Sequence, residues 1–282
     1  MRHAGRYAVV LALLGMPAAA HAQGDCFPPA GSREVKLFAK FAVPLAFSEG
    51  EAPTRAVAGR VRLRLDASYL PKIDSATRTA TICRPGKGPE YTDLLFVLPR
   101  PRLQVGLPAG FVLEASWVPP VRVNGVKANL LGLSLGQSIG VGSRGVLGLR
   151  AHASFGTVHA PITCPDAALA DPASECYQGT RSDDSYRPDI FGAEASLGVP
   201  VGSGALRPYI GAGVNVLRPR FRVNFTNRVG ELDNRRIEAD LTRGAVFGGL
   251  TWAPARVALS AEVYASPGDA VTARVGVGYM LR

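Results

Sequence analysis

Residues Gly59–Tyr69 read Gly-Arg-Val-Arg-Leu-Arg-Leu-Asp-Ala-Ser-Tyr and alternate strictly between apolar and polar side chains. Successive side chains of a β-strand point to opposite faces, so one face of this segment is apolar and the other is charged. Strands that cross a membrane in a barrel need about 9–11 residues, whereas strands of soluble proteins average about 5–6. The stretch therefore favours a lipid-facing strand over the half-buried strand of a soluble sheet.

The same alternation recurs through the rest of the chain. It is clear in seven further segments: Phe111–Pro119, Val126–Leu135, Val146–Thr157, Phe191–Val199, Arg207–Val216, Val257–Tyr264 and Val271–Leu281. Tyr91–Leu107, interrupted by Pro99 and Pro101, and the glycine-rich Leu241–Trp252 alternate less regularly. Counting both, we expect about ten strands (a range of 8–12), and an even number is usual in bacterial single-chain barrels.

The connections between these segments fall into two classes. Short ones are expected at Leu107–Gly110, Gln137–Gly145, Pro200–Ala205 and Ala253–Arg256, and long ones at Leu70–Glu90, His159–Pro188 and Asn227–Asp240. Outer-membrane barrels have short periplasmic turns, long outer loops and aromatic residues near both membrane surfaces, here Tyr69, Trp117, Trp252 and Tyr279. The fold class is therefore all-β: an antiparallel transmembrane up-and-down β-barrel over residues 57–282. A soluble secreted β protein is the alternative.

The N-terminus has the three parts of an export signal. Arg2 and Arg6 precede the apolar run Tyr7–Met16, and small residues follow it up to Ala22. We expect a signal peptide over residues 1–22, cleavage after Ala22 and localisation in the bacterial outer membrane. The net charge of +10 would suggest nucleic acid in a cytosolic protein, but export argues against that partner.

If the apolar faces meet lipid, the charged faces line the lumen. An arginine facing lipid at mid-membrane would cost about 2–4 kcal/mol, which decides the orientation. The expected lumen-lining residues are Arg60, Arg62, Arg64, Glu114, Arg150, His152, Glu194, Glu262 and Arg274. Arginines two residues apart on a strand lie about 6.6 Å apart and repel by roughly 2.5 kcal/mol at an effective dielectric near 20. The arginine row therefore needs bulk water or the carboxylates of Glu114, Glu194 and Glu262, and ten strands favour a filled, salt-bridged interior over an open pore.

The four cysteines of an exported chain predict two disulfides. Cys164 and Cys176 lie in one expected loop, which leaves Cys26 to pair with Cys83. That second pair would join the expected periplasmic start of the chain to an outer loop, and a plug crossing the lumen would remove this conflict. Residues 23–56 are therefore read as an N-terminal segment that forms a plug or an extra strand. Within it Glu34–Phe47 carries a helical apolar stripe, although Pro44 argues against a long helix.

The C-terminal third resembles small outer-membrane barrels of the OmpA/OmpW-like type. The segment Arg207-Pro208-Tyr209-Ile210-Gly211-Ala212-Gly213-Val214 and the last strand Val271–Leu281 carry the resemblance, and the rest of the chain matches by pattern only. The resemblance implies contact with outer-membrane lipid and lipopolysaccharide, and insertion by the barrel-insertion machinery. The chain departs from the type at Leu281-Arg282, where those proteins usually end on an aromatic residue.

Few residues suggest chemistry. His152 and Ser154 on one strand look like the His and Ser arrangement of outer-membrane lipid A deacylases, but we favour a structural lumen histidine. Glu175, Asp183, Asp184 and Asp189 would suit calcium or simply a solvated loop. No metal, cofactor or catalytic residue is assigned.

The sequence thus predicts a non-enzymatic barrel that is structural or gives narrow, plugged passive transport of small solutes. Two alternatives stay open: a lipid-modifying enzyme, and a plugged transporter for small apolar compounds.

Overall fold

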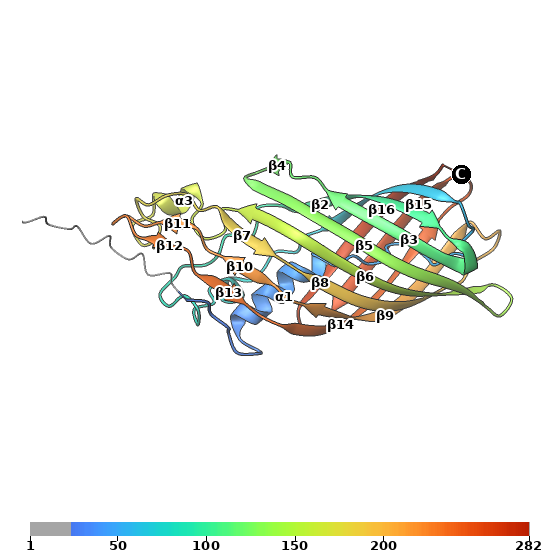
Figure 1. The fold of residues 1–282 in the computed structure, drawn as a ribbon, viewed down its shortest axis with the longest axis horizontal. Helices are drawn as coiled ribbons and strands as arrows, with labels where there is room; N and C mark the ends of the chain where they lie inside the picture. Colours follow the sequence, from blue (N-terminus) through green and yellow to red (C-terminus); the bar gives the residue numbers. More distant parts are fainter. Residues whose placement is uncertain (1–23, 282) are drawn as a thin grey trace, which may run out of the picture.

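Ten long strands form a closed antiparallel barrel in the computed structural model, which describes residues 24–281 (Figure 1). The strands are β1 Val61–Tyr69, β2 Val97–Gly106, β3 Phe111–Val118, β5 Val126–Val141, β6 Gly145–Ala160, β8 Ile190–Gly198, β9 Leu206–Leu217, β14 Leu241–Trp252, β15 Val257–Ser266 and β16 Ala270–Met280. Each pairs with the next, and the pairing of β1 with β16 closes the ring. The expected strand count and fold class are confirmed, while the signal peptide lies outside the described residues.

The outer face of the barrel is an apolar belt, as the alternation predicts. Large side chains remain exposed there on every one of the ten strands, among them Leu63, Leu103, Leu113, Leu133, Leu149, Phe191, Ile210, Val246, Val263 and Val275. The four aromatic residues expected near strand ends, Tyr69, Trp117, Trp252 and Tyr279, are also exposed on this face. So much exposed apolar surface is stable only against lipid, and a closed barrel leaves no unpaired strand edge in the membrane.

One end of the barrel carries short turns. The turn between β5 and β6 is shorter than expected, because the strands continue to Val141 and resume at Gly145. The glycines of this stretch indicated a loop in the sequence. The two strands nevertheless pair with each other along their whole length, from Lys127–His159 to Val141–Gly145.

The other end carries a folded cap, drawn at the left of Figure 1. The short strands β7 Asp184–Arg187, β10 Arg220–Arg222 and β13 Arg236–Glu238 continue the sheet from the upper part of β6. Beside them lie β4 Arg122–Val123, the hairpin β11 Phe225–Thr226 with β12 Leu232–Asp233, and the helices α2 Ser75–Arg78 and α3 Asp166–Leu169. The turn η1 Pro108–Gly110 belongs to the opposite end. None of the helices among residues 24–281 is long and apolar enough to span a membrane.

The N-terminal segment begins in the cap and descends through the barrel. Cys26 makes a β-bridge to Ile237 in β13, and α1 Arg33–Leu45 then lies inside the ring of strands (Figure 1). Ser32 caps the start of the helix, where its side chain accepts a hydrogen bond from the Val35 backbone N–H. Pro44 cannot donate the i→i−4 hydrogen bond, and the helix ends one residue after it, at Leu45. Of the two readings of Glu34–Phe47, a helix or an extra strand, the structure has the helix.

Candidate functional site: the occupied lumen

The lumen wall is charged where β1 and β2 run side by side. Arg64, Asp66, Arg100 and Arg102 are each at most 5% exposed and point inward from these two strands. Arg100 and Arg102 were not among the residues expected in the lumen, because Pro99 and Pro101 interrupt the strand pattern of alternating apolar and polar residues. Both prolines are exposed on the outer face, and the pairing of β2 with β3 begins only at Arg102, so neither proline interrupts it.

Below α1 the chain continues as an extended segment, Ala46–Pro53, down the middle of the barrel. Its backbone carbonyls, with those of the last helical turn, accept hydrogen bonds from five arginines of the wall. The bonds run from Arg274 to Val43 and Ala46, from Arg100 to Leu45 and Ala46, from Arg150 to Phe47, from Arg102 to Ser48 and Glu49, and from Arg64 to Glu49 and Gly50, at 2.5–3.4 Å. The wall thus holds the segment by hydrogen bonds to its backbone carbonyls, which do not depend on the identity of the side chains of the segment.

Phe47 is the side chain most tightly held. It is fully buried, and the guanidinium carbons of Arg102, Arg150 and Arg100 lie 4.5, 4.7 and 5.6 Å from its ring centroid. A cation over an aromatic face contributes about 0.5–2 kcal/mol, more when water is excluded. The ring therefore fixes the level at which the segment sits in the lumen.

The wall arginines are also paired with carboxylates. Arg102 lies 2.7 Å from Asp66 and 3.1 Å from Glu114, and Arg150 lies 3.0 Å from Glu194. A buried charge without a partner costs several kcal/mol, so each pair needs all its members.

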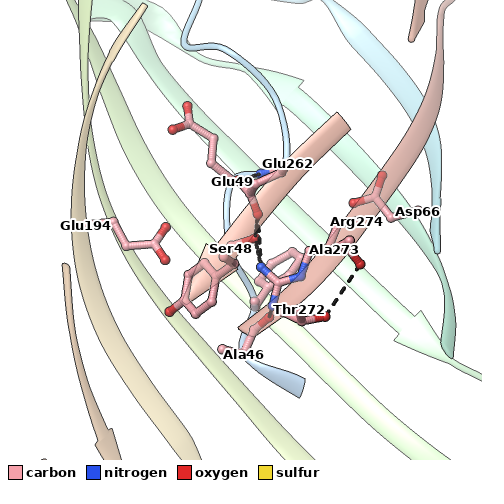
Figure 2. Close-up of polar contacts among 12 residues, drawn as sticks. Ala46, Ser48, Glu49, Asp66, Glu194, Glu262, Thr272, Ala273 and Arg274 are labelled. Atoms are coloured by element: carbon pink, nitrogen blue, oxygen red, sulfur yellow. Dashed lines mark hydrogen bonds and ion pairs between the residues drawn. The ribbon is translucent and has the colours of Figure 1, made fainter. Parts of the chain in front are cut away.

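Arg274 joins the wall to the segment through Ser48. Figure 2 shows its guanidinium between Ala46, the Ser48 hydroxyl and Glu262. The Glu262 carboxylate lies 3.1 Å from Arg274 and accepts further hydrogen bonds from the Ser48 hydroxyl and the Gly50 N–H. Gly50 has φ +71°, and a Cβ atom there would come within 3.1 Å of the Arg64 guanidinium, so this close approach requires glycine.

The structure places the residues expected in the lumen as follows. Glu114, Arg150, Glu194, Glu262 and Arg274 all belong to the network just described, whereas Arg60 is exposed at the mouth below β1. Glu114, Glu194 and Glu262 were expected beside the arginines of β1, but these arginines have other partners. Arg62 and Arg64 pair with Glu51, at 2.6 and 3.6 Å, and Arg64 also pairs with Asp66 at 3.0 Å. Glu51 comes from the N-terminal segment, whose path the strand pattern does not reveal.

His152 and Ser154 both point inward from β6. His152 Nε2 lies 3.4 Å from Glu194 Oε1, and the Ser154 hydroxyl donates to the Leu45 carbonyl at 3.4 Å. Both side chains are buried behind the N-terminal segment and face away from lipid. The structure thus gives lipid no access to these two side chains, which a deacylase would require.

The cysteines and the acidic loop residues lie in the cap. Disulfides join Cys26 to Cys83 and Cys164 to Cys176, with Cα atoms 5.8 and 5.6 Å apart. The acidic residues are dispersed among different partners: Glu175 lies 2.8 Å from Arg84, Asp183 3.9 Å from Arg122 and Asp189 3.7 Å from Arg187, while Asp184 accepts backbone hydrogen bonds. Within residues 24–281 no three acidic, histidine or cysteine residues could hold a metal ion.

Two cavities flank the N-terminal segment. One of about 90 Å³ lies below it and is lined by Glu49, Glu51, Arg62, Glu114 and Arg150. The other, of about 100 Å³, lies beside α1 and is mostly apolar, with Phe41, Leu98, Ala128, Leu130 and Val158 in its lining. The segment between them is fully buried at Phe47 and Ser48 and 1% exposed at Ala52, so it fills the middle of the barrel.

Comparison with known proteins adds structural likenesses. No protein family and no curated protein matches the sequence. Among solved structures, the attachment invasion locus protein Ail of Yersinia pestis covers 80% of this chain and 100% of its own at 8% identity and a TM-score of 0.31. The translocator domain of autotransporter NalP from Neisseria meningitidis covers 79% and 88% at 12% identity and a TM-score of 0.43. Neisserial surface protein A covers 78% and 95% at 10% identity and a TM-score of 0.30.

This chain is a transmembrane β-barrel. The closed ten-stranded wall, its apolar outer belt and its charged interior carry that statement.

Proposed function

We propose that this protein is a passive channel for small solutes whose lumen is closed at rest by residues 33–58. The hydrogen bonds from the five wall arginines to the carbonyls of Val43–Gly50 carry the proposal. A purely structural barrel of this size can fill its lumen with its own inward side chains. Here the N-terminal segment fills the lumen instead. Reversible contacts with the wall hold this segment, and one disulfide anchors its outer end.

That anchor is the Cys26–Cys83 disulfide. It ties the start of the segment to the outer loop, while the lower end continues into β1. The segment is therefore held at both ends, and in the middle by Phe47. Releasing the outer end and the Phe47 contact together is the smallest change that should let the segment leave the lumen.

The test is conductance of the full chain in a planar bilayer. Wild-type protein is expected to stay closed under oxidising conditions, and the variant Cys26→Ser/Cys83→Ser/Phe47→Ala to open. The matched control is Cys164→Ser/Cys176→Ser/Phe111→Ala, which removes the other disulfide and an outward phenylalanine and should stay closed. A released variant that never conducts, although it migrates as a folded barrel on gels, would overturn the proposal.

A second candidate is transport of small apolar compounds, and the apolar cavity beside α1 favours it. An apolar cavity of about 150 Å³ can hold a ring the size of benzene, so this one would take a slightly smaller group. Filling it with Ala128→Leu should lower uptake of a small apolar dye into liposomes. Uptake equal to that of wild type would count against this candidate.

The remaining expectations belong to the same proposal. Export through the signal peptide of residues 1–22 and insertion by the barrel-insertion machinery would place the cap outside the cell. The apolar belt meets outer-membrane lipid, and the cap then stands at the level of the lipopolysaccharide headgroups.

A further inference from the structure

The outer surface of the cap sheet carries a ladder of arginines. In β10, Phe221 is buried while Arg220 and Arg222 are exposed, and the neighbouring strands add Arg187 and Arg236 on the same face. The register sets Arg220 directly opposite Arg187, and Arg222 directly opposite Arg236. Like charges directly opposite each other destabilise a sheet. Two such pairs on three adjacent short strands are therefore a cost that needs a compensating anion.

The carboxylates near this ladder compensate it only in part. Arg187, Arg218 and Arg220 lie 3.7, 3.8 and 3.5 Å from Asp189, Asp240 and Glu238. The three arginine side chains are 48–59% exposed, and exposed ion pairs contribute only about 0–1 kcal/mol. Within residues 24–281, neither Arg222 nor Arg236 forms an ion pair. The guanidinium groups are therefore available to an external anion.

The position of the ladder identifies that anion. Along β9 the outward residues Val214 and Val216 are apolar and face lipid, and the next exposed residues are Arg218 and Arg220. At a rise of about 3.3 Å per residue along strands tilted by about 45°, these arginines lie roughly 5–9 Å beyond the last apolar residue along the membrane normal. That is the depth at which the polar headgroups of the outer leaflet lie.

We infer that Arg187, Arg218, Arg220, Arg222 and Arg236 form a binding surface for phosphorylated lipid headgroups, with the phosphates of lipid A as the occupant. The planar guanidinium matches phosphate with two parallel hydrogen bonds, which lysine cannot provide, and every cation of the ladder is arginine. The surface lies on the outside of the cap, away from the lumen, so the inference rests on the proposed outer-membrane placement and not on whether the barrel conducts.

The test uses the full chain in detergent with lipid A added, and measures bound lipid by native mass spectrometry. Wild-type protein should retain lipid A, and Arg187→Gln/Arg220→Gln/Arg222→Gln should lose at least tenfold in affinity. The matched control is Arg122→Gln/Arg181→Gln/Arg228→Gln, which removes three exposed arginines of the cap outside β7, β10 and β13 and should bind as wild type.

Two further arms separate the sources of binding. Monophosphoryl lipid A should bind more weakly than the bisphosphorylated form, and inorganic phosphate at millimolar concentration should not displace either. Equal loss in the control triple variant, or unchanged binding in the ladder variant, would overturn the inference. So would equal retention of phosphatidylcholine, because binding would then follow the apolar belt alone.

Discussion

At the scale of residues, Arg100 and Arg102 are neighbours on one face of β2 with different partners. Arg102 sits between the carboxylates of Asp66 and Glu114, whereas Arg100 donates to the carbonyls of Leu45 and Ala46. Among residues 24–281 no carboxylate forms an ion pair with Arg100. Both side chains are only 4% exposed. At Arg100, backbone carbonyls of the N-terminal segment thus serve as the hydrogen-bond acceptors, a role that carboxylates have at Arg102.

This difference predicts the cost of removing each charge. Arg102→Met leaves the buried carboxylates of Asp66 and Glu114 with one arginine partner each, Arg64 and Arg150, and should destabilise the protein by up to about 3–5 kcal/mol. Arg100→Met leaves carbonyl oxygens unsatisfied and should cost about 1–3 kcal/mol. Unfolding in urea with the protein in detergent micelles measures both. Equal losses, or a larger loss for Arg100→Met, would contradict the pairing described here.

At the scale of elements, the strands could be predicted from the sequence, whereas the residues that fill the barrel could be predicted only in part. Period-two alternation located β1, β3, β9 and β16 to within two residues at each end, because a lipid-facing strand must be apolar on one side. Among the partners of the lumen arginines, the strand carboxylates Glu114, Glu194 and Glu262 could be predicted. Glu51 and the carbonyls of Leu45–Gly50 could not, because they come from a segment without strand periodicity. The cap strands β7, β10 and β13 have only 3–4 residues each, too few for alternation to show.

The cap contains one titrating group with a clear consequence. The buried Asp184 carboxyl accepts hydrogen bonds from Thr163 N–H and the Ser182 hydroxyl of the β6–β7 loop and from Asn224 N–H between β10 and β11, and so joins two loops. Burial raises the pKa of Asp184 to about 6, above the value near 3.9 of an unfolded chain. The folded cap therefore holds this proton more tightly. Its stabilisation is complete below about pH 4 and is lost as the pH rises through about 6.

We therefore expect the cap to open more readily at pH 7.5 than at pH 5, with a difference of about 1.4 kcal/mol. Limited proteolysis of the outer loops in detergent measures this. Asp184→Asn cannot titrate, so its cleavage rate should lack this pH dependence once corrected for the activity of the protease. The same slope in wild type and in Asp184→Asn would refute the assignment.

At the scale of the whole molecule, the charges in the middle of the lumen balance only with the N-terminal segment in place. The strands contribute six arginines, Arg62, Arg64, Arg100, Arg102, Arg150 and Arg274, and four carboxylates, Asp66, Glu114, Glu194 and Glu262. Glu49 and Glu51 of the segment supply two more. A lumen from which the segment has left is therefore positive, and its field favours anions.

The openings of Cys26→Ser/Cys83→Ser/Phe47→Ala should accordingly select for chloride over potassium. The reversal potential in a potassium chloride gradient measures this selectivity. Adding Arg62→Gln and Arg100→Gln should reduce the preference, because within residues 24–281 the hydrogen-bond acceptors of these two arginines all belong to the segment. Cation-selective openings would show that the charges described here do not line the open path.

The central claim is that residues 46–53 run through the barrel, and an engineered disulfide tests it most directly. A Cβ atom on Gly198 of β8 would lie 3.5 Å from the Cβ of Ala52, within disulfide range, and 3.0 Å from the Pro53 ring. The variant is therefore Ala52→Cys/Gly198→Cys in a Pro53→Ala background. Its control moves the second cysteine to Val199, which is exposed on the outer face.

The measurement is mass spectrometry of non-reduced peptides from the full chain purified from membranes. We expect a disulfide between positions 52 and 198 and none between positions 52 and 199. Free thiols at both 52 and 198, in protein that migrates as a folded barrel, would contradict it.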